Sequence, residues 1–237
     1  DGAEISLRRP SSLSRCFYLG SETFFPLRDM ATVAKLHGCF FPRFSPESMI
    51  EKLQSFGISP SQRLSKMSLG TRQKAMLAYA LSLNVDVLLL DEPTNGLDIE
   101  SKAILQDMLL SSTNDDSIVI VSTHIISDLQ NIFDSMMVMQ KNRLLLNADT
   151  NDIAERLAFV SSYSEIPGAL FSEWSAGALH SILSPLAADD LDLRPGPVDL
   201  RLLYIALHSK ANQGVINALQ VNPLLEFSRL ETTQTPS

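Results

Sequence analysis

Residues 85–98, VDVLLLDEPTNGLD, combine a short apolar run with two carboxylates at its end. A continuous apolar run of this length is typical of a parallel strand that is covered on both faces. Asp91 and Glu92 stand where the strand ends, and open α/β folds bind their ligands at the carboxyl ends of their strands. A turn containing Pro and Gly then carries Asp98 away from the strand.

Two neighbouring carboxylates suit the hydrolysis of a nucleotide. One carboxylate helps to hold Mg²⁺, which neutralises charge on the phosphates, and the second orients and deprotonates the attacking water. An Asp-Glu pair alone is common, however, and by itself it is more often a solvated strand end. The choice between a hydrolytic site and a solvated strand end therefore depends on the rest of the sequence.

Two further features favour a phosphate site. Ser68 and Gly70 lie at the start of a predicted helix, where exposed amides, a hydroxyl group and a glycine form an anion site. An ordinary N-capped helix start is the alternative explanation. His124 follows a predicted buried strand at 117–122, so we expect it at the same sheet edge as the two carboxylates.

The remaining pattern alternates strands and helices, which indicates an α/β fold with a mainly parallel sheet. Strands are predicted at 16–19, 85–90 and 117–122, helices at 46–56, 68–83, 99–110, 125–133 and 198–207, and a hairpin of 136–139 with 143–146 turning at Lys141-Asn142. Beyond about residue 159 the periodicity weakens. We expect one domain over 1–158 and a C-terminal α+β extension over 159–237 that ends in a disordered tail.

The composition narrows the class of protein. The 237 residues are 45% hydrophobic and carry a net charge of -8, which allows a packed core and argues against a nucleic-acid partner. Cys16 and Cys39 lack metal-site spacing, and two thiols in a chain of this length favour a reducing compartment. No apolar run approaches the length needed to cross a bilayer.

Four motifs resemble those of one family when they are taken together. MSLGTRQK, VLLLDE, NGLD and STH resemble, in order, the signature motif, Walker B strand, D-loop and switch histidine of the nucleotide-binding domain of ABC transporters. The resemblance covers 1–158 and is strongest over 64–124. It implies a P-loop NTPase-like fold, and the stretches around FFP and FSPESMIEKLQSFGI further resemble ATPase subunits of prokaryotic export-type systems.

The resemblance implies an ATPase that couples hydrolysis of ATP to transport, with ATP and Mg²⁺ as cofactors. Asp91 would coordinate Mg²⁺ through water, Glu92 would be the general base for the attacking water, and His124 would contact the γ-phosphate.

The family closes head to tail around two nucleotides, so the resemblance also implies a dimer of nucleotide-binding domains. Ser68 and Gly70 would contact ATP bound to the opposite subunit, and Asp98 would lie across the dimer interface. The partner would be a separate transmembrane subunit. The protein would be cytoplasmic and peripheral on the cytoplasmic face of the membrane.

The sequence departs from the family at three places. Leu69 and Thr71 replace a Gly and a Gln of the signature motif, and Ser21 or Glu22 stands where the Q-loop glutamine is expected. No G-x-x-x-x-G-K-[ST] loop occurs. We interpret this as truncation before or through that loop, and we expect the chain alone to bind ATP poorly, to be inactive and to expose unpaired strand edges.

Two other functions fit some of these residues. A non-hydrolysing regulatory or partner subunit would offer Ser68, Gly70 and Asp98 to a phosphate-binding loop on another protein. A DNA-repair member of the same superfamily would need coiled-coil or zinc insertions, and the sequence has neither. Reading the DNA upstream of Asp1 would separate the first alternative from a truncated ATPase.

Overall fold

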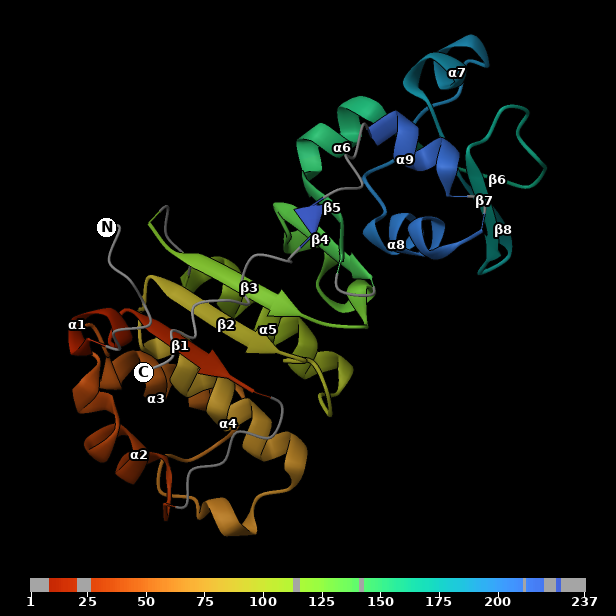
Figure 1. Cartoon of the computed structure of the whole chain (residues 1–237). Helices are drawn as coiled ribbons and strands as arrows, with labels where there is room; N and C mark the ends of the chain where they lie inside the picture. The colour runs from red at the N-terminus through yellow and green to blue at the C-terminus, as the bar shows by residue number, and fades with distance from the viewer. Residues whose placement is uncertain are drawn as a thin grey trace, which may run out of the picture. The chain divides into compact units, whose positions relative to one another are not determined.

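The computed structural model describes residues 9–20, 27–112, 116–140, 143–210, 212–219 and 225–226. The chain divides into two compact units, Asp1–Asp128 and Leu129–Ser237 (Figure 1). The domain boundary expected between residues 158 and 159 falls inside the second unit, at the start of strand β6 (Ala158–Ser162). That expectation followed a change in composition, whereas the division of the structure follows packing.

The first unit is built on a parallel sheet of three strands in the order β1-β2-β3. The strands are β1 (Cys16–Leu19), β2 (Val87–Asp91) and β3 (Ile118–Ser122), which confirms the predicted strands and the α/β class. Asp91 pairs in register with Ser122. The last residues of β2 and β3 therefore lie side by side at one edge of the sheet.

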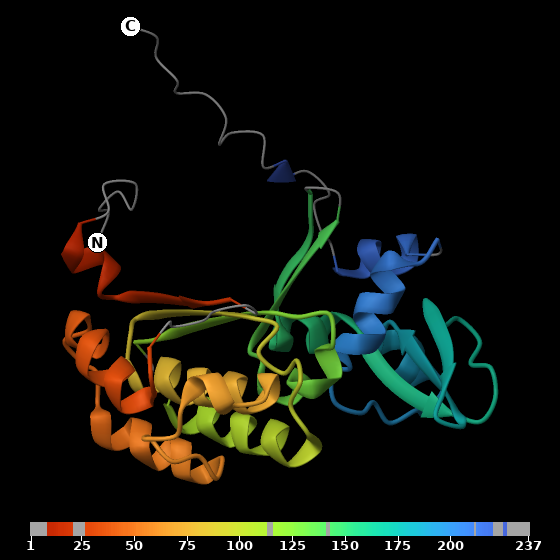
Figure 2. The same ribbon diagram turned by 90° about the horizontal axis from the view of Figure 1, so that it is seen from below.

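Helices cover one face of this sheet (Figure 2). The principal helices are α2 (Met30–Leu36), α3 (Pro46–Ser55), α4 (Leu69–Ser82) and α5 (Ile99–Ser112), and the short ones are α1 (Pro10–Leu13), η2 (Gly38–Phe40) and η3 (Leu64–Lys66). Phe17, Leu88 and Leu90 project onto the covered face and are buried there. This packing confirms the predicted helices at 46–56, 68–83 and 99–110.

The opposite face of the sheet is open to solvent, so the prediction that its strands are covered on both faces is wrong for the residues described. Tyr18, Leu89 and Ile120 are aligned across the three strands on this face. Tyr18 is 58% exposed and Ile120 is 38% exposed. The cause is that, over residues 9–20, 27–112 and 116–128, every principal helix lies on the other side (Figure 2).

Helix α4 holds the first unit together. Its predicted apolar stripe is confirmed, because Met76, Tyr79, Ala80 and Leu83 are all buried. The Tyr79 hydroxyl lies 2.6 Å from Nδ1 of His37. Burial raises the pKa of Tyr79 and lowers that of His37, so both groups stay neutral near pH 7. A helix fixed in this way presents its N-terminus, at Ser68, in a defined position.

The prediction of a helix at 125–133 is wrong. The segment forms two short 3₁₀ turns, η4 (Ile126–Asp128) and η5 (Gln130–Ile132). Between them Leu129 adopts φ -135° and ψ 5°, which is outside the helical region, and its side chain is fully buried. The non-helical backbone at Leu129 therefore breaks the run of hydrogen bonds that a continuous helix would need.

The second unit begins with the predicted hairpin. Strands β4 (Ser135–Gln140) and β5 (Arg143–Asp149) pair antiparallel, and β9 (Leu225–Glu226) adds to β5. The predicted turn at Lys141-Asn142 lies outside the described residues. A change of register between Val138 and Met139 marks an irregularity in the pairing.

A second antiparallel sheet, in the order β6-β8-β7, follows the hairpin. Its strands are β6, β7 (Phe171–Ser175) and β8 (Ala178–Leu183), and the helices of this unit are α6 (Thr150–Arg156), α7 (Pro185–Asp190), α8 (Leu200–His208) and α9 (Gln213–Leu219). Helix α8, which was predicted at 198–207, packs on β7 and β8. The extension is therefore an ordered α+β structure over the residues described.

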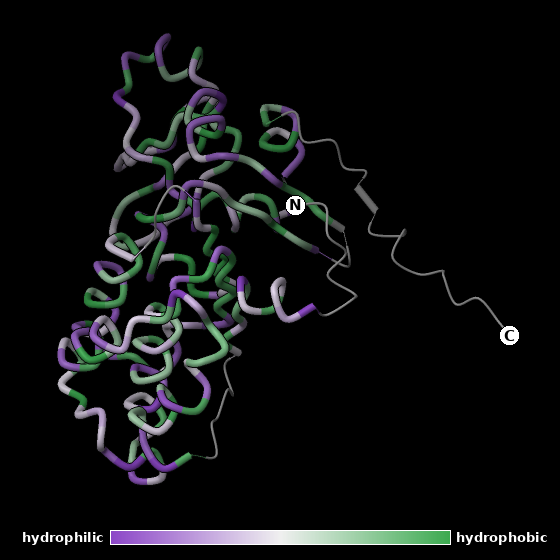
Figure 3. Tube along the Cα trace, turned by 90° about the vertical axis from the view of Figure 1, so that its left-hand side faces the viewer, coloured by the Kyte–Doolittle hydropathy of each residue, from purple (hydrophilic) through white to green (hydrophobic). Residues whose placement is uncertain are grey.

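Hydrophobic positions are dispersed along both units rather than gathered in one long segment, as the hydropathy colouring of Figure 3 shows. Over the residues that the structure describes, no helix has both the length and the hydrophobicity required to span a bilayer.

Candidate functional site

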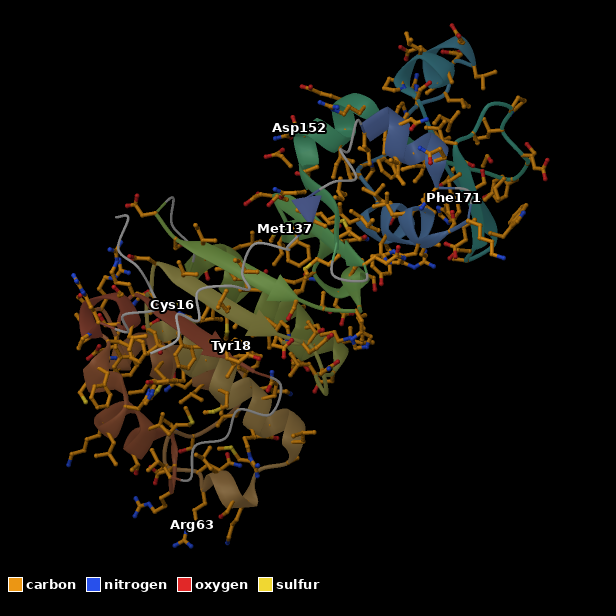
Figure 4. The ribbon with its side chains drawn as sticks, in the orientation of Figure 1. Cys16, Tyr18, Arg63, Met137, Asp152 and Phe171 are labelled. Carbon is orange, nitrogen blue, oxygen red and sulfur yellow. The ribbon has the colours of Figure 1, made fainter. Side chains whose placement is uncertain are left out.

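Asp91 lies at the carboxyl end of β2, where hydroxyl groups from both neighbouring strands reach it. Ser122 on β3 donates its hydroxyl to Oδ1 of Asp91 at 2.6 Å. Tyr18, which lies near the end of β1 (Figure 4), donates its hydroxyl to Oδ2 at 3.2 Å. Both oxygens of the carboxylate are therefore oriented at the sheet edge.

Glu92 is held beside Asp91 by contacts with the segment after β3. Its backbone nitrogen donates to the carbonyl of Ser122 at 2.8 Å. Its Oε1 accepts from the backbone nitrogen of His124 at 3.1 Å and lies 2.7 Å from Nδ1 of that ring. The hydroxyl of Thr123 lies 3.3 Å from Oε2.

The backbone of Glu92 is strained, with φ +48°. A left-handed conformation at a residue other than Gly costs about 1–3 kcal/mol and persists only where the surroundings impose it. The strain turns the side chain of Glu92 toward His124, which is itself 68% exposed. Asp91, Glu92 and His124 form what we call the carboxylate cluster.

Ser68 is the N-cap of α4. Its hydroxyl oxygen accepts from the backbone nitrogen of Thr71 at 3.1 Å and lies 2.8 Å from the Thr71 hydroxyl. Leu69, which follows it, is 75% exposed. The Ser68 oxygen is thus already engaged with its own helix, as the ordinary N-cap explanation predicts.

Gly70 lies against the turn that follows β2. A Cβ atom at Gly70 would stand 2.4 Å from the carbonyl oxygen of Gly96. Gly96 itself has φ +74°, a conformation that favours glycine. The two glycines therefore permit a close backbone contact between the start of α4 and the turn, and any side chain at Gly70 would disrupt it.

Asp98 joins the same two elements through its side chain. Its Oδ1 accepts from the backbone nitrogen of Ser101 at 2.8 Å and so caps α5. Its Oδ2 forms an ion pair with Nζ of Lys74 on α4 at 2.9 Å. Hydrogen bonds from Ser101, followed by the one from Lys74, hold the pKa of Asp98 well below its usual range. Ser68, Gly70 and Asp98 form what we call the helix-start cluster.

The six predicted residues thus fall into two groups of three. Among the described residues, no hydrogen bond or ion pair joins the carboxylate cluster to the helix-start cluster. Ser21 and Glu22, the predicted substitutes for a Q-loop glutamine, lie outside the described residues. The roles of the six residues stay predictions.

Sequence reasoning did not find Tyr18, Ser122 and Lys74. The first two could have been found by aligning the ends of the predicted strands, because residues at neighbouring strand ends share an edge. Lys74 lies one helical turn after Gly70, so its position on the same face of α4 was also available from the sequence.

The carboxylate cluster offers oxygen atoms, which are the ligands that Mg²⁺ prefers. Magnesium is usually bound by one or two carboxylates together with the phosphates of the substrate, and Asp91 with its oriented oxygens fits such a role. The described residues contain no group of three or more His, Cys, Asp or Glu side chains that could hold a metal by themselves.

Comparison with known families finds a match within the first unit. Residues 21–95 match the model of the ABC transporter family. An uncharacterized ABC transporter ATP-binding protein of Methanocaldococcus jannaschii, MJ1023, is 26% identical over 46% of this chain and 40% of its own length. The Nod factor export ATP-binding protein I of Burkholderia orbicola is 27% identical over 59% of this chain and 47% of its own length.

An arabinose import ATP-binding protein, AraG, of Pseudomonas savastanoi is 33% identical over 46% of this chain and 22% of its own length. The chain therefore spans less than half the length of the curated relatives that it matches.

Solved structures show the same fold. An ATP-binding subunit of an ABC transporter superposes with a TM-score of 0.61 and 17% identity, over 88% of this chain and 74% of that one. The ATP-binding cassette MJ0796, solved as a dimer bound to ADP and Pi, superposes with a TM-score of 0.52 and 18% identity, over 62% of this chain and 68% of that one. Over the parts that superpose, the chain therefore has the fold of these two ATP-binding proteins.

Proposed function

Because residues 21–95 match the model of the ABC transporter family, we propose that the chain supplies the hydrolytic part of an ATP site in a transport ATPase. The observation that carries the proposal is the contact of 2.7 Å between Oε1 of Glu92 and Nδ1 of His124, beside Asp91. A general base must be held in a defined position, and this contact holds the Glu92 carboxylate.

Each residue of the carboxylate cluster then has a separate role. Glu92 accepts the proton of the water that attacks the γ-phosphate. His124 contacts the γ-phosphate, and it also fixes the Glu92 carboxylate through its ring and its backbone nitrogen. Asp91 holds Mg²⁺ through water, while Ser122 and Tyr18 keep the Asp91 carboxylate in position. Mg²⁺, when bound, neutralises charge on the β- and γ-phosphates.

The helix-start cluster serves a second nucleotide in this proposal. Its amides at the start of α4 would contact the γ-phosphate of ATP that is held by an opposite subunit, in a homodimer or heterodimer. The Ser68 hydroxyl accepts from the Thr71 amide, and its own proton can go to the phosphate when the Thr71 hydroxyl is the donor in the contact between the two hydroxyls. Asp98 would lie at the interface between the two subunits.

The phosphate-binding loop must come from outside these 237 residues, since their sequence contains no G-x-x-x-x-G-K-[ST]. We therefore propose activity for a protein in which such a loop completes the site, and inactivity for this chain alone. The absence of the loop also favours the alternative of a non-hydrolysing partner that completes another protein's site. The carboxylate cluster favours the ATPase, because a chain that never acts on a nucleotide has little use for it.

The partner in this proposal is a separate transmembrane subunit, which places the chain on the cytoplasmic face of the membrane. We propose export as the direction of transport. The support is the resemblance of the segment around FSPESMIEKLQSFGI to export-type subunits, and similarity to the Nod factor export protein. The arabinose import protein is a relative whose name gives the opposite direction of transport.

Replacing Glu92 with Gln tests the assignment in a protein completed by a phosphate-binding loop. The amide keeps the shape of the carboxylate but cannot accept the proton, so turnover of ATP should fall by at least about 10²-fold while ATP-dependent dimerisation persists. Ser172→Ala, on the exposed side of β7, is the control and should leave turnover unchanged. Unchanged turnover in Glu92→Gln would remove Glu92 from the role of base.

A further inference from the structure

The second unit contains a pocket that the ATPase proposal does not use. Its volume is about 430 Å³, and its walls come from the turn η5, strands β6 and β8, residues 194–199 and helix α8. Pockets of roughly 300–1,000 Å³ that combine apolar walls with a few polar groups are typical of sites for small molecules. Its size is therefore sufficient for a small organic ligand.

The wall of the pocket combines apolar side chains with polar ones. Phe159 and Leu202 line it and are buried. The ring of His180 is held at both ends, since Nε2 lies 3.2 Å from the carbonyl of Ser175 and Nδ1 lies 3.0 Å from the Ser161 hydroxyl. A carbonyl only accepts, so Nε2 carries the proton, and in the neutral ring Nδ1 accepts from Ser161.

Three polar side chains in the lining can form further hydrogen bonds or ion pairs. Oε1 of Gln130 is buried without a hydrogen-bond partner among the described residues. Asp199 uses one oxygen, Oδ1, to cap α8 by accepting from the Leu202 nitrogen at 2.9 Å. Arg194 forms no ion pair or hydrogen bond with any residue that the structure describes. The lining thus holds one cation, one anion and one unsatisfied acceptor.

We propose that this pocket binds a free α-amino acid with an apolar side chain. The carboxylate of such a ligand pairs with Arg194, and its ammonium group donates to Asp199 and to Oε1 of Gln130. Its side chain packs on Phe159 and Leu202. A ligand with only one charge leaves the opposite charge of the lining without a partner, so the lining favours a zwitterion.

The Gln130 Oε1 atom, which lacks a hydrogen-bond donor within the described part of the chain, adds to the preference for a ligand with an ammonium group. A buried acceptor without a donor is unfavourable, and a ligand N–H removes that cost. The Ser161 hydroxyl and the His180 ring satisfy each other and so do not compete for the ligand. The inference concerns the second unit only, and it is independent of whether the carboxylate cluster hydrolyses ATP.

A matched series of ligands tests the charge assignment on the full chain. L-leucine carries both charges, leucinamide lacks the carboxylate, and N-acetyl-leucine lacks the ammonium group. Isothermal titration at pH 6.5 should show saturable binding of L-leucine or L-phenylalanine, with both leucine analogues weaker by about tenfold or more. No saturable binding of either amino acid, or equal binding of the three leucine compounds, would overturn the proposal.

Variants assign each charge to its residue. Arg194→Gln should weaken leucine about tenfold and leave leucinamide unchanged, because leucinamide has no carboxylate to lose. Asp199→Asn keeps an N-cap residue on α8 and should weaken leucine but not N-acetyl-leucine.

Arg201→Gln is the matched control for these variants, since Arg201 lies on α8 and pairs with Glu173 at 3.2 Å rather than lining the pocket. It should leave leucine binding unchanged. Equal losses in Arg194→Gln and Arg201→Gln, or no loss in Arg194→Gln, would contradict the assignment. Circular dichroism of each variant distinguishes lost binding from lost folding.

Discussion

The carboxylate cluster and the helix-start cluster contain similar polar residues but use them differently. In the carboxylate cluster the side chains of Glu92 and His124 contact each other, and the strained backbone of Glu92 is held by the end of β3. In the helix-start cluster Ser68 and Asp98 cap helices, and Gly70 permits a backbone contact. The first arrangement directs side chains toward one another at the edge of the sheet, whereas the second connects and caps helices.

The largest effect on stability should come from Gly70→Ala. The added methyl group would stand 2.4 Å from the Gly96 carbonyl oxygen, so the backbone must shift, at a cost of about 1–3 kcal/mol. Urea unfolding measures this cost. Gly196→Ala adds the same methyl group at an ordinary 3.7 Å from its nearest neighbour and should change stability by less than about 0.5 kcal/mol. Equal effects of the two variants would mean that the Gly70 contact is not tight.

A smaller effect should follow from changes at Ser68, and two variants separate its structural role from its proposed contact with phosphate. Ser68→Ala removes the N-cap of α4 and should lower the free energy of unfolding by about 1 kcal/mol. Ser68→Asp keeps the cap, so its stability should stay close to that of the wild type. In a completed protein its negative charge should nevertheless prevent ATP-dependent dimerisation, and dimerisation of Ser68→Asp would argue against a phosphate contact at this position.

The smallest effect should appear in acid. The pKa of Asp98 in the folded chain is held below the value of about 3.9 that applies in the unfolded chain, so its contribution to stability is present above that value. The contribution is lost as the pH falls through about 4 toward the folded pKa, because the unfolded chain takes up the proton first. Thermal unfolding from pH 5 to pH 3 should therefore depend on pH less steeply in Asp98→Asn. An unchanged slope would show that the hydrogen bonds of Asp98 contribute little.

Much of the first unit follows from local sequence. The run that ends in Asp91 predicts a strand, and the N-cap at Ser68 predicts a helix start, because both signals lie within a few residues. The prediction at 125–133 fails at Leu129, where the backbone leaves the helical region despite the local helical pattern. The exposed face around Ile120 could not be predicted, since exposure depends on which elements pack there.

The sequence predicted the six candidate residues, but it did not predict that they lie in two separate clusters. Asp91 and His124 share an edge because strands end side by side, which the order of strands and helices indicates. The contacts of Tyr18 and Ser122 with Asp91 depend on register, and the approach of Gly70 to Gly96 depends on tertiary packing. These distances are set by the complete fold, so local sequence patterns do not predict them.

Titration of this chain with Mg-ATP tests the central claim most directly. We claim that the chain holds the hydrolytic residues of an ATP site without the loop that binds the phosphates. Isothermal titration should then show no binding in the micromolar range, because the lysine and backbone amides of that loop are absent from the sequence. Micromolar affinity of the 237-residue chain for Mg-ATP would contradict the account.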